Sequence, residues 1–288
     1  MVTIKNDTLT LLVDERGAEM TSLRTADGRE VLWSADPKVW GRHAPLLFPV
    51  VGALGNGVYR HGGQTYAMDQ HGFARDGAFV VESREPDAAT LLLRDTPASR
   101  AIYPFAFALR VGYRLRGNTV EVRYTVDNLA REEMLFSIGA HPGFACPMGP
   151  GEDYSDCFLE FEEPETLGTR LLNASSRVAP ELHPFLQGER VLPLGSDTFR
   201  RGAFILEGFR SQAVTLRGGK SGHAVRVAFP GFPYLGIWAM PGAPFVCIEP
   251  WFGVADLEGF EGEFADKAGV MRLAPGGTFR CAHTITVE

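Results

Sequence analysis

Apolar and polar residues alternate with a period of two along several stretches of the chain. In residues 107–116 the odd-numbered positions are apolar and the even-numbered ones are small or basic, whereas in residues 119–126 the apolar residues are even-numbered. The dipeptide Gly117-Asn118 separates the two runs. A period of two is typical of strands with one buried face, and a two-residue turn containing glycine and asparagine favours a hairpin. These residues therefore predict an antiparallel β-hairpin.

The same alternation recurs elsewhere, while helical periodicity is nearly absent. Further strands are predicted at residues 225–229 and 279–287, and shorter ones at 9–13, 79–81, 91–93 and 158–161. Short helical turns are expected only near residues 97–102 and 266–269. No linker, charge run or internal repeat divides the chain. Together these patterns predict an all-β protein, a single antiparallel β-sandwich domain spanning residues 1–288.

Composition narrows the class of protein. The chain of 288 residues is 45% hydrophobic and 22% charged, which is close to the average for a globular protein. Its 33 glycines and 19 prolines indicate many turns. A net charge of −7 argues against a nucleic-acid partner, which requires a basic face. The sequence has no apolar run of eighteen residues and begins without a signal-peptide pattern, so we expect no membrane partner and a cytoplasmic location.

Candidate chemistry is concentrated where histidine and glutamate stand beside glycine, proline and aromatic residues. We expect His71 and His141 each to lie at a strand end, beside glycine or proline, and each is followed within three residues by a phenylalanine. Such loops are how a β-scaffold presents a binding site. A lone histidine is more often structural, but this context favours a functional role for both. His283, on the apolar face of the last predicted strand, is expected to pack in the core.

Glu249 ends an apolar run that should form a buried strand. Partial desolvation raises the pKa of a carboxyl group toward the range that suits general acid–base catalysis. An equally weighted alternative is that Glu249 forms an ion pair with Arg42 or Arg75 and holds strands together.

Other kinds of site receive little support. The four cysteines are scattered without a Cys-x-x-Cys pair, which disfavours a disulfide framework or a structural zinc site. A zinc site formed by His71, His141 and Glu249 is conceivable, but no two histidines have close ligand spacing. Gly219-Lys220-Ser221 lacks the preceding glycine of a phosphate-binding loop, because Val214 stands there.

Several short motifs, taken together and in order, resemble the aldose 1-epimerase (galactose mutarotase-like) family, and in particular its shorter bacterial branch. They are G-A-E-x-x-S-L at 17–23, L-F-P-x-x-G at 47–52, H-G-F-A-R-D at 71–76, H-P-G-F at 141–144, Tyr-Leu-Gly-Ile-Trp at 234–238 and C-I-E-P-W at 247–251. Each motif is weak alone, but their shared order extends over about two hundred residues.

The resemblance implies a β-supersandwich with a sugar-binding cleft and interconversion of the α and β anomers of a free aldose, with no cofactor and no metal. It implies Glu249 as the base, His141 as the acid and His71 as a residue that binds the sugar. Opening a cyclic hemiacetal requires removal of the proton on the C1 hydroxyl and delivery of a proton to the ring oxygen, which one carboxyl and one imidazole can perform. Trp238 or Trp251 could stack on the sugar.

Two positions depart from the family pattern. Ala53 stands where relatives of this branch often have arginine, so a basic contact to the substrate is either missing or supplied by Arg42 or Arg75. Gly202 stands where an acidic residue is usual, and Asp197, five residues earlier, is the available substitute for binding a sugar hydroxyl. Both departures bear on which substrate is bound rather than on which reaction is catalysed.

The expected partner is therefore a monosaccharide, bound by a monomer or a homodimer. A hexose-6-phosphate 1-epimerase would use the same chemistry, with Arg42 and Arg75 as phosphate clamps. A non-catalytic carbohydrate-binding protein on the same scaffold is a third possibility, and a glycosidase or lyase is a fourth.

Overall fold

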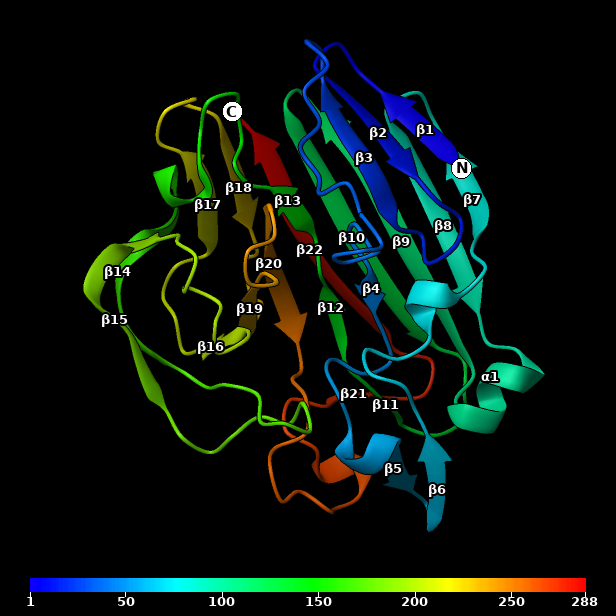
Figure 1. Ribbon diagram of the computed structural model, residues 1–288. Coiled ribbons are helices and arrows are strands. Elements are labelled where there is room, and N and C mark those ends of the chain that lie inside the picture. Colours follow the sequence, from blue (N-terminus) through cyan, green and yellow to red (C-terminus); the bar gives the residue numbers. More distant parts are fainter.

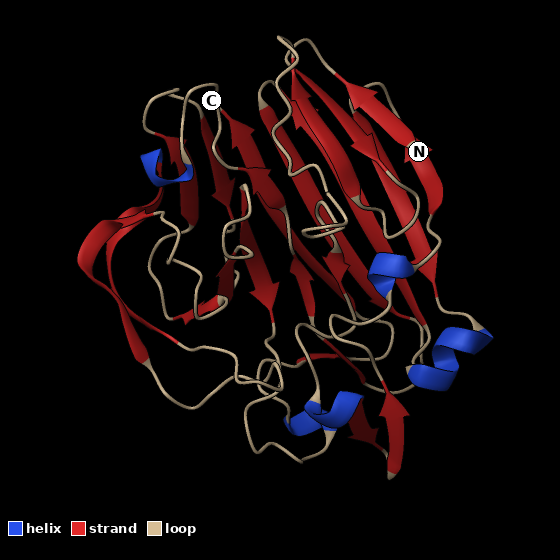
Figure 2. Cartoon of the chain, viewed as in Figure 1, coloured by secondary structure: helices blue, strands red, loops and turns tan.

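The chain is folded into two facing layers of antiparallel strands. The computed structural model describes all residues, 1–288. Figure 1 shows the broad sheet behind the shorter ones, and Figure 2 shows how little helix connects them. The sole α-helix is α1 (Pro97–Ile102), with 3-10 turns at Gly55–Gly57, Ala74–Asp76, Tyr154–Asp156 and Phe264–Asp266. The predicted all-β fold is thus confirmed, as is the helical turn at 97–102, whereas the turn expected at 266–269 lies slightly earlier.

The back layer is a nine-stranded sheet in the order β15-β14-β17-β18-β22-β10-β9-β8-β7. Its strands are β7 (Val80–Arg84), β8 (Ala88–Arg94), β9 (Phe107–Arg116), β10 (Thr119–Asn128), β14 (Cys157–Thr169), β15 (His183–Pro193), β17 (Ala213–Gly218), β18 (Ala224–Ala228) and β22 (Thr278–Val287). β9 and β10 form the predicted hairpin, with Arg116 opposite Thr119. Their alternating burial follows directly from their sequence alternation.

The front layer contains a six-stranded sheet and a three-stranded one. The six-stranded sheet has the order β16-β19-β20-β12-β4, and β13 also pairs with β20. Its strands are β4 (Leu46–Leu47), β12 (Ile138–Ala140), β13 (Gly143–Ala145), β16 (Phe204–Glu207), β19 (Tyr234–Trp238) and β20 (Phe245–Phe252). The three-stranded sheet is β1 (Val2–Lys5), β2 (Leu9–Val13) and β3 (Met20–Thr25), and two small pairs are β5 (Val58–His61) with β6 (Gln64–Ala67) and β11 (Met134–Phe136) with β21 (Met271–Leu273).

A core of 65 buried residues fills the space between the layers. A separate cluster of seven buried residues lies in the front layer, and it contains Trp251 of β20. β20 is buried over nearly its whole length, because it stands between these two clusters. The strand that carries Glu249 is therefore rigidly placed.

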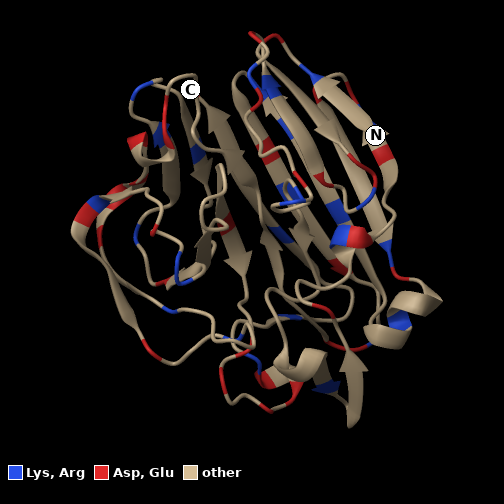
Figure 3. Ribbon diagram, in the orientation of Figure 1, with Lys and Arg blue, Asp and Glu red and all other residues tan.

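Two further findings concern the distribution of charged residues and the character of the helices. Basic and acidic residues are interspersed along the ribbon (Figure 3). None of the helices has the length and apolar character needed to cross a bilayer.

Candidate functional site

A cleft of about 290 Å³ opens on the front layer above β20. Its wall combines aromatic, aliphatic and ionisable side chains from segments far apart in the sequence: Trp40, Arg42, Pro45, Val51, Gly52, Gln70, His71, Arg75, His141, Leu172, Ala203, Ile205, Trp238, Glu249, Trp251 and Ala255. Six of the seven residues that the sequence singled out as site residues line this cleft. Such a mixture of apolar walls with a few convergent polar groups is typical of a small-molecule site.

His141 and Glu249 face each other because of strand register. β12 pairs with β20 through Gly139, and β13 pairs with β20 through Gly143, in the same register on both sides of a short break. His141 lies in that break, directly across from Glu249. The imidazole Nε2 is 3.1 Å from a carboxylate oxygen of Glu249, and both side chains are almost fully buried.

This contact leaves polar atoms available. The 3.1 Å approach lacks the alignment of a hydrogen bond, so Oε2 of Glu249 has no hydrogen-bond partner, and neither has Nδ1 of His141. Buried polar atoms are nearly always paired in folded proteins, and exceptions point to function. These two atoms are suited to receive hydroxyl groups of a ligand.

Burial shifts the pKa of both groups toward the uncharged form. It raises the pKa of Glu249 well above its usual value, although the neighbouring Trp251 indole opposes the shift. Burial lowers the pKa of His141 to about 3. The pair therefore favours a protonated carboxyl beside a neutral imidazole.

His71 is fixed in one tautomer by the backbone. It adopts a left-handed conformation with φ of 68°, and its Nδ1 accepts a hydrogen bond of 3.1 Å from the amide of Gly52. Burial lowers its pKa well below the usual value. The ring is therefore neutral with its proton on Nε2, which lies next to the side-chain amide of Gln70. Its ring centre lies 5.6 Å from that of His141.

The two arginines of the cleft pair with Asp76, not with Glu249. Both carboxylate oxygens of Asp76 accept hydrogen bonds from Arg42, at 3.0 and 3.1 Å, and the Nε of Arg75 is 3.8 Å from Asp76. The alternative in which Glu249 forms an ion pair with either arginine is therefore wrong. Nε of Arg75 is buried without a hydrogen-bond partner.

Three tryptophans shape the cleft. Trp251 lies flat on the sheet because Gly139 and Gly236 leave it room; a Cβ at these glycines would come within 2.5 and 2.2 Å of the indole. Trp238 and Trp251 both line the cleft, which answers the question that the sequence left open. Trp40, which the sequence did not single out, has its ring centre 5.0 Å from His141.

Asp197 is not brought to the cleft. It lies exposed in the turns after β15, and its backbone carbonyl accepts a hydrogen bond from Arg200. Gly202 itself does not line the cleft, and of the two residues next to it only Ala203 does. Gln70 is the polar lining residue that sequence reasoning missed, although it directly precedes His71.

Two buried carboxylates support the cleft from outside. Oε1 of Glu19 accepts hydrogen bonds from the amides of His43 and Ala44, at 2.7 and 2.9 Å, and so fixes the segment that carries Trp40 and Arg42. This explains structurally why a glutamate stands in the motif at 17–23.

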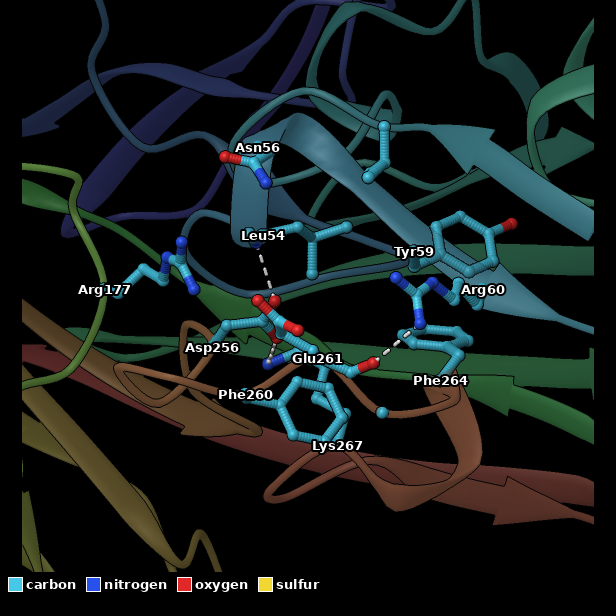
Figure 4. Close-up of a pocket in the computed structure, with 13 residues that line it drawn as sticks. Leu54, Asn56, Tyr59, Arg60, Arg177, Asp256, Phe260, Glu261, Phe264 and Lys267 are labelled. Carbon is cyan, nitrogen blue, oxygen red and sulfur yellow. Dashed lines mark hydrogen bonds and ion pairs between the residues drawn. The ribbon is translucent and has the colours of Figure 1, made fainter.

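The second carboxylate, Asp256, belongs to a buried ion pair with Lys267, whose ammonium nitrogen lies 3.2 Å away. Figure 4 shows both residues in a small neighbouring pocket beside Leu54. Asp256 accepts a hydrogen bond of 2.7 Å from the amide of Gly55 and donates its own amide to Ala53, at 2.9 Å. It thereby anchors the loop whose Gly52 amide contacts His71.

Metal-binding donors are also present. Donor atoms of His141, Cys247 and Glu249 lie within 4.8 Å of one another. Burial and the nearby Glu249 raise the pKa of the Cys247 thiol well above its usual value. Since the thiolate is the form that ligates metals, this environment disfavours the soft ligand of that group.

Comparison with known proteins shows matches over the whole chain. A profile of the family described as aldose 1-epimerase matches residues 1–172. The protein LacX (chromosomal) of Lactococcus lactis subsp. lactis is 35% identical over 302 residues, covering 99% of each chain.

Two solved structures are similar in both sequence and shape. A galactose mutarotase related enzyme from Lactobacillus acidophilus is 36% identical with a TM-score of 0.93, covering 100% of this chain and 97% of that one. A galactose mutarotase-like protein from Lactobacillus casei ATCC 334 is 32% identical with a TM-score of 0.94, covering 100% of both chains.

Proposed function

The chain belongs to the aldose 1-epimerase family, and we propose that it interconverts the α and β anomers of a free aldose in the cleft above β20. One observation carries the proposal most: His141 and Glu249 lie 3.1 Å apart, buried, with unpartnered polar atoms in a sugar-sized cleft. Opening and reclosing a hemiacetal needs one group to take a proton and another to give one.

In the proposed reaction, Glu249 takes the proton of the C1 hydroxyl while His141 delivers a proton to the ring oxygen. The C5–O5 hydroxyl and the C1 aldehyde form as the C1–O5 bond breaks. After the C1–C2 bond rotates, the same two transfers in reverse close the ring on the other face. Protons are conserved, and no redox step occurs.

The ionised form of the pair is needed for this step, although burial favours the uncharged one. Both forms hold the same number of protons and differ only in which of the two side chains carries one of them. A substrate hydroxyl that donates to Glu249 stabilises the carboxylate. Substrate binding can therefore generate the reactive form without a proton from solvent.

The remaining cleft residues would hold the sugar. His71 offers an N–H from Nε2, Gln70 an amide, and Arg42 and Arg75 guanidinium donors. Trp238 and Trp251 provide flat apolar surfaces for the C–H faces of a pyranose. We propose a monosaccharide as the minimal substrate and no cofactor for this chemistry.

The direct test is polarimetry of freshly dissolved α-D-glucose and α-D-galactose, with wild type and Glu249→Gln beside the spontaneous rate. We expect acceleration by wild type and a loss of about 10²- to 10⁴-fold in kcat for the variant, the usual contribution of a general base. Undiminished turnover by Glu249→Gln would refute the assignment. Sugar binding without acceleration by wild type would favour a carbohydrate-binding protein.

A second candidate, a hexose-6-phosphate 1-epimerase, is favoured by Arg42 and Arg75 in the cleft wall and by the unpartnered Nε of Arg75. Guanidinium groups with free donors bind phosphate well. Inorganic phosphate should compete with substrate only in this case. Glucose 6-phosphate should then have a kcat/KM above that of glucose, and Arg75→Met should remove the difference.

A further inference from the structure

The ion pair of Asp256 and Lys267 is buried behind the cleft, where stability alone does not account for it. Both side chains are almost fully buried, and Lys267 also donates a hydrogen bond to the backbone carbonyl of Val254. Figure 4 shows the two side chains beside the loop that contains Leu54. Burying two charges is costly, and apolar residues of similar volume often stabilise a protein as well or better. Burial accordingly lowers the pKa of Lys267, and the Asp256 carboxylate opposes this shift.

Asp256 fixes the segment between β4 and β5 that contains Gly52. Its Oδ2 accepts a hydrogen bond of 2.7 Å from the amide of Gly55, and its own amide donates to the carbonyl of Ala53 at 2.9 Å. The preceding residue, Ala255, packs tightly against Gly52, because a Cβ on that glycine would lie 2.4 Å from the Ala255 methyl group. The ion pair therefore determines where this segment lies.

The same segment holds His71 through two hydrogen bonds of Gly52. The Gly52 amide donates to Nδ1 of His71 at 3.1 Å, and the Gly52 carbonyl accepts from the His71 amide at 2.9 Å. His71 has a φ of 68°, a left-handed conformation that is uncommon outside glycine and persists where the surroundings enforce it. Because one glycine makes both contacts, a displacement of the segment would move the ring and remove the partner of its Nδ1.

The contact with Gly52 decides which ring nitrogen of His71 carries the proton. A backbone amide only donates, so Nδ1 is the acceptor and Nε2 carries the hydrogen. Nε2 lies next to the side-chain amide of Gln70, which also lines the cleft. Burial keeps the ring uncharged by lowering its pKa well below the usual value, so the tautomer is the property that can vary. The other tautomer would turn the Nε2 donor into an acceptor.

We propose that the Asp256–Lys267 ion pair positions His71 for the proposed reaction, by keeping its imidazole in the tautomer that donates an N–H to the sugar. This inference rests on the proposed anomer interconversion. Neither member of the ion pair lines the cleft, so both are positioning residues that act through the backbone. Their replacement should weaken substrate binding and leave proton transfer between His141 and Glu249 in place.

The first test removes both charges together, so that no unpaired charge stays buried. Asp256→Leu/Lys267→Met replaces the pair by apolar side chains of comparable shape, which the fold should tolerate, and removes the acceptor of the Gly55 amide. In polarimetry of glucose we expect KM to rise about 3- to 10-fold, the effect of one hydrogen bond, while kcat changes less than about two-fold. A lower thermal midpoint with an unchanged KM would indicate a merely structural role and overturn the proposal.

A second test leaves the ion pair intact and removes only its hydrogen bond to the loop. Gly55→Pro lacks the amide hydrogen, while Gly55→Ala keeps it and is the matched control. Proline suits the start of the 3-10 turn Gly55–Gly57, because Leu54 before it is extended with a ψ of 155°. A Cβ at Gly55 would lie 3.3 Å from the Arg177 guanidinium, which is the far end of a flexible side chain. We expect KM to rise in Gly55→Pro alone, and equal KM values in both variants would overturn the proposal.

Nitrogen NMR of the His71 ring reads the tautomer without any turnover, and so separates this inference from the proposed function. In wild type we expect Nε2 to be protonated and Nδ1 unprotonated, with His71→Gln identifying the two signals by their loss. In Asp256→Leu/Lys267→Met and in Gly55→Pro the signals should move toward each other as both tautomers become populated. This change would support the positioning role even if no sugar is turned over, in which case only the proposed function fails. Unchanged ring signals in both variants would overturn the positioning role.

Discussion

His141 and His283 are both buried histidines, but one faces a cleft and the other lies in the core. Burial lowers the pKa of each to about 3, and each has a ring nitrogen without a partner. His283 lies on β22 within the core, its ring stacked on Tyr124 at 5.7 Å. His141 lies at a strand break, facing a carboxylate and an open cleft.

The difference shows that a depressed histidine pKa does not by itself identify a reactive group. His283 is enclosed in the core beside the rings of Tyr124 and Phe232, so its neutral state serves packing alone. The imidazole of His141 can exchange a proton with Glu249 and reach a ligand. A perturbed pKa gains functional meaning only together with a partner and an accessible cavity.

Replacing each histidine in turn should give the largest difference in catalytic activity between two variants. We expect His141→Gln to lower kcat for mutarotation by about 10²- to 10⁴-fold, because the variant cannot protonate the ring oxygen. His283→Phe should keep wild-type kcat and KM in the same polarimetric assay. A large loss of activity in His283→Phe would contradict the purely structural role of His283.

Glycine replacements sharpen the contrast between the cleft floor and the broad sheet. In Gly236→Ala the new Cβ would lie 2.2 Å from the Trp251 indole, whereas in Gly112→Ala on β9 the nearest atom is 3.7 Å away. We expect the first to lower the free energy of unfolding by about 1–3 kcal/mol, the usual cost of overpacking, and to weaken sugar binding. Gly112→Ala should be neutral in both. Denaturant titration and calorimetry measure the two effects, and similar outcomes for the two variants would contradict the steric argument.

A last difference concerns acid stability. In the folded protein His283 stays neutral down to about pH 3, whereas in the unfolded chain it takes up a proton below about pH 6.5. The unfolded state thus binds more protons in this range, so stability falls as the pH falls from 6.5 toward 3. His283→Phe should remove this contribution, of at most about 1.4 kcal/mol per pH unit. Thermal unfolding of wild type and variant between pH 7 and pH 4 should therefore show a shallower decline for the variant.

The sequence predicted the elements governed by local pattern. The hairpin at 107–126 and the strands at 9–13 and 279–287 follow from alternation, and the glycine-asparagine turn sets the hairpin register. The core position of His283 followed from its place on an apolar strand face, and the structure confirms it. Six of the seven predicted site residues share one cleft, and all of these except Arg42 stand in the motifs that carry the family resemblance.

What the sequence did not predict depends on contacts between distant segments. The short strands β4, β12 and β13 have too few residues for a periodic signal. The pairing of Arg42 with Asp76 and of Lys267 with Asp256 requires knowing which loops meet. Asp197 was chosen by its distance along the chain from a missing acidic residue, but its turn is directed elsewhere, and sequence spacing contains no such information.

The placement of His141 in the break between β12 and β13, opposite Glu249 on β20, has an evolutionary consequence. Their separation is set by the pleat and spacing of paired strands, which vary little among proteins. The residues that surround a bound ligand, by contrast, come largely from loops, which tolerate substitution and insertion. Selection could therefore change the preferred ligand repeatedly by altering loop residues while the proton-transfer pair remains in place. A scaffold with this division of labour is well suited to diversification, and also to laboratory evolution that targets the loops alone.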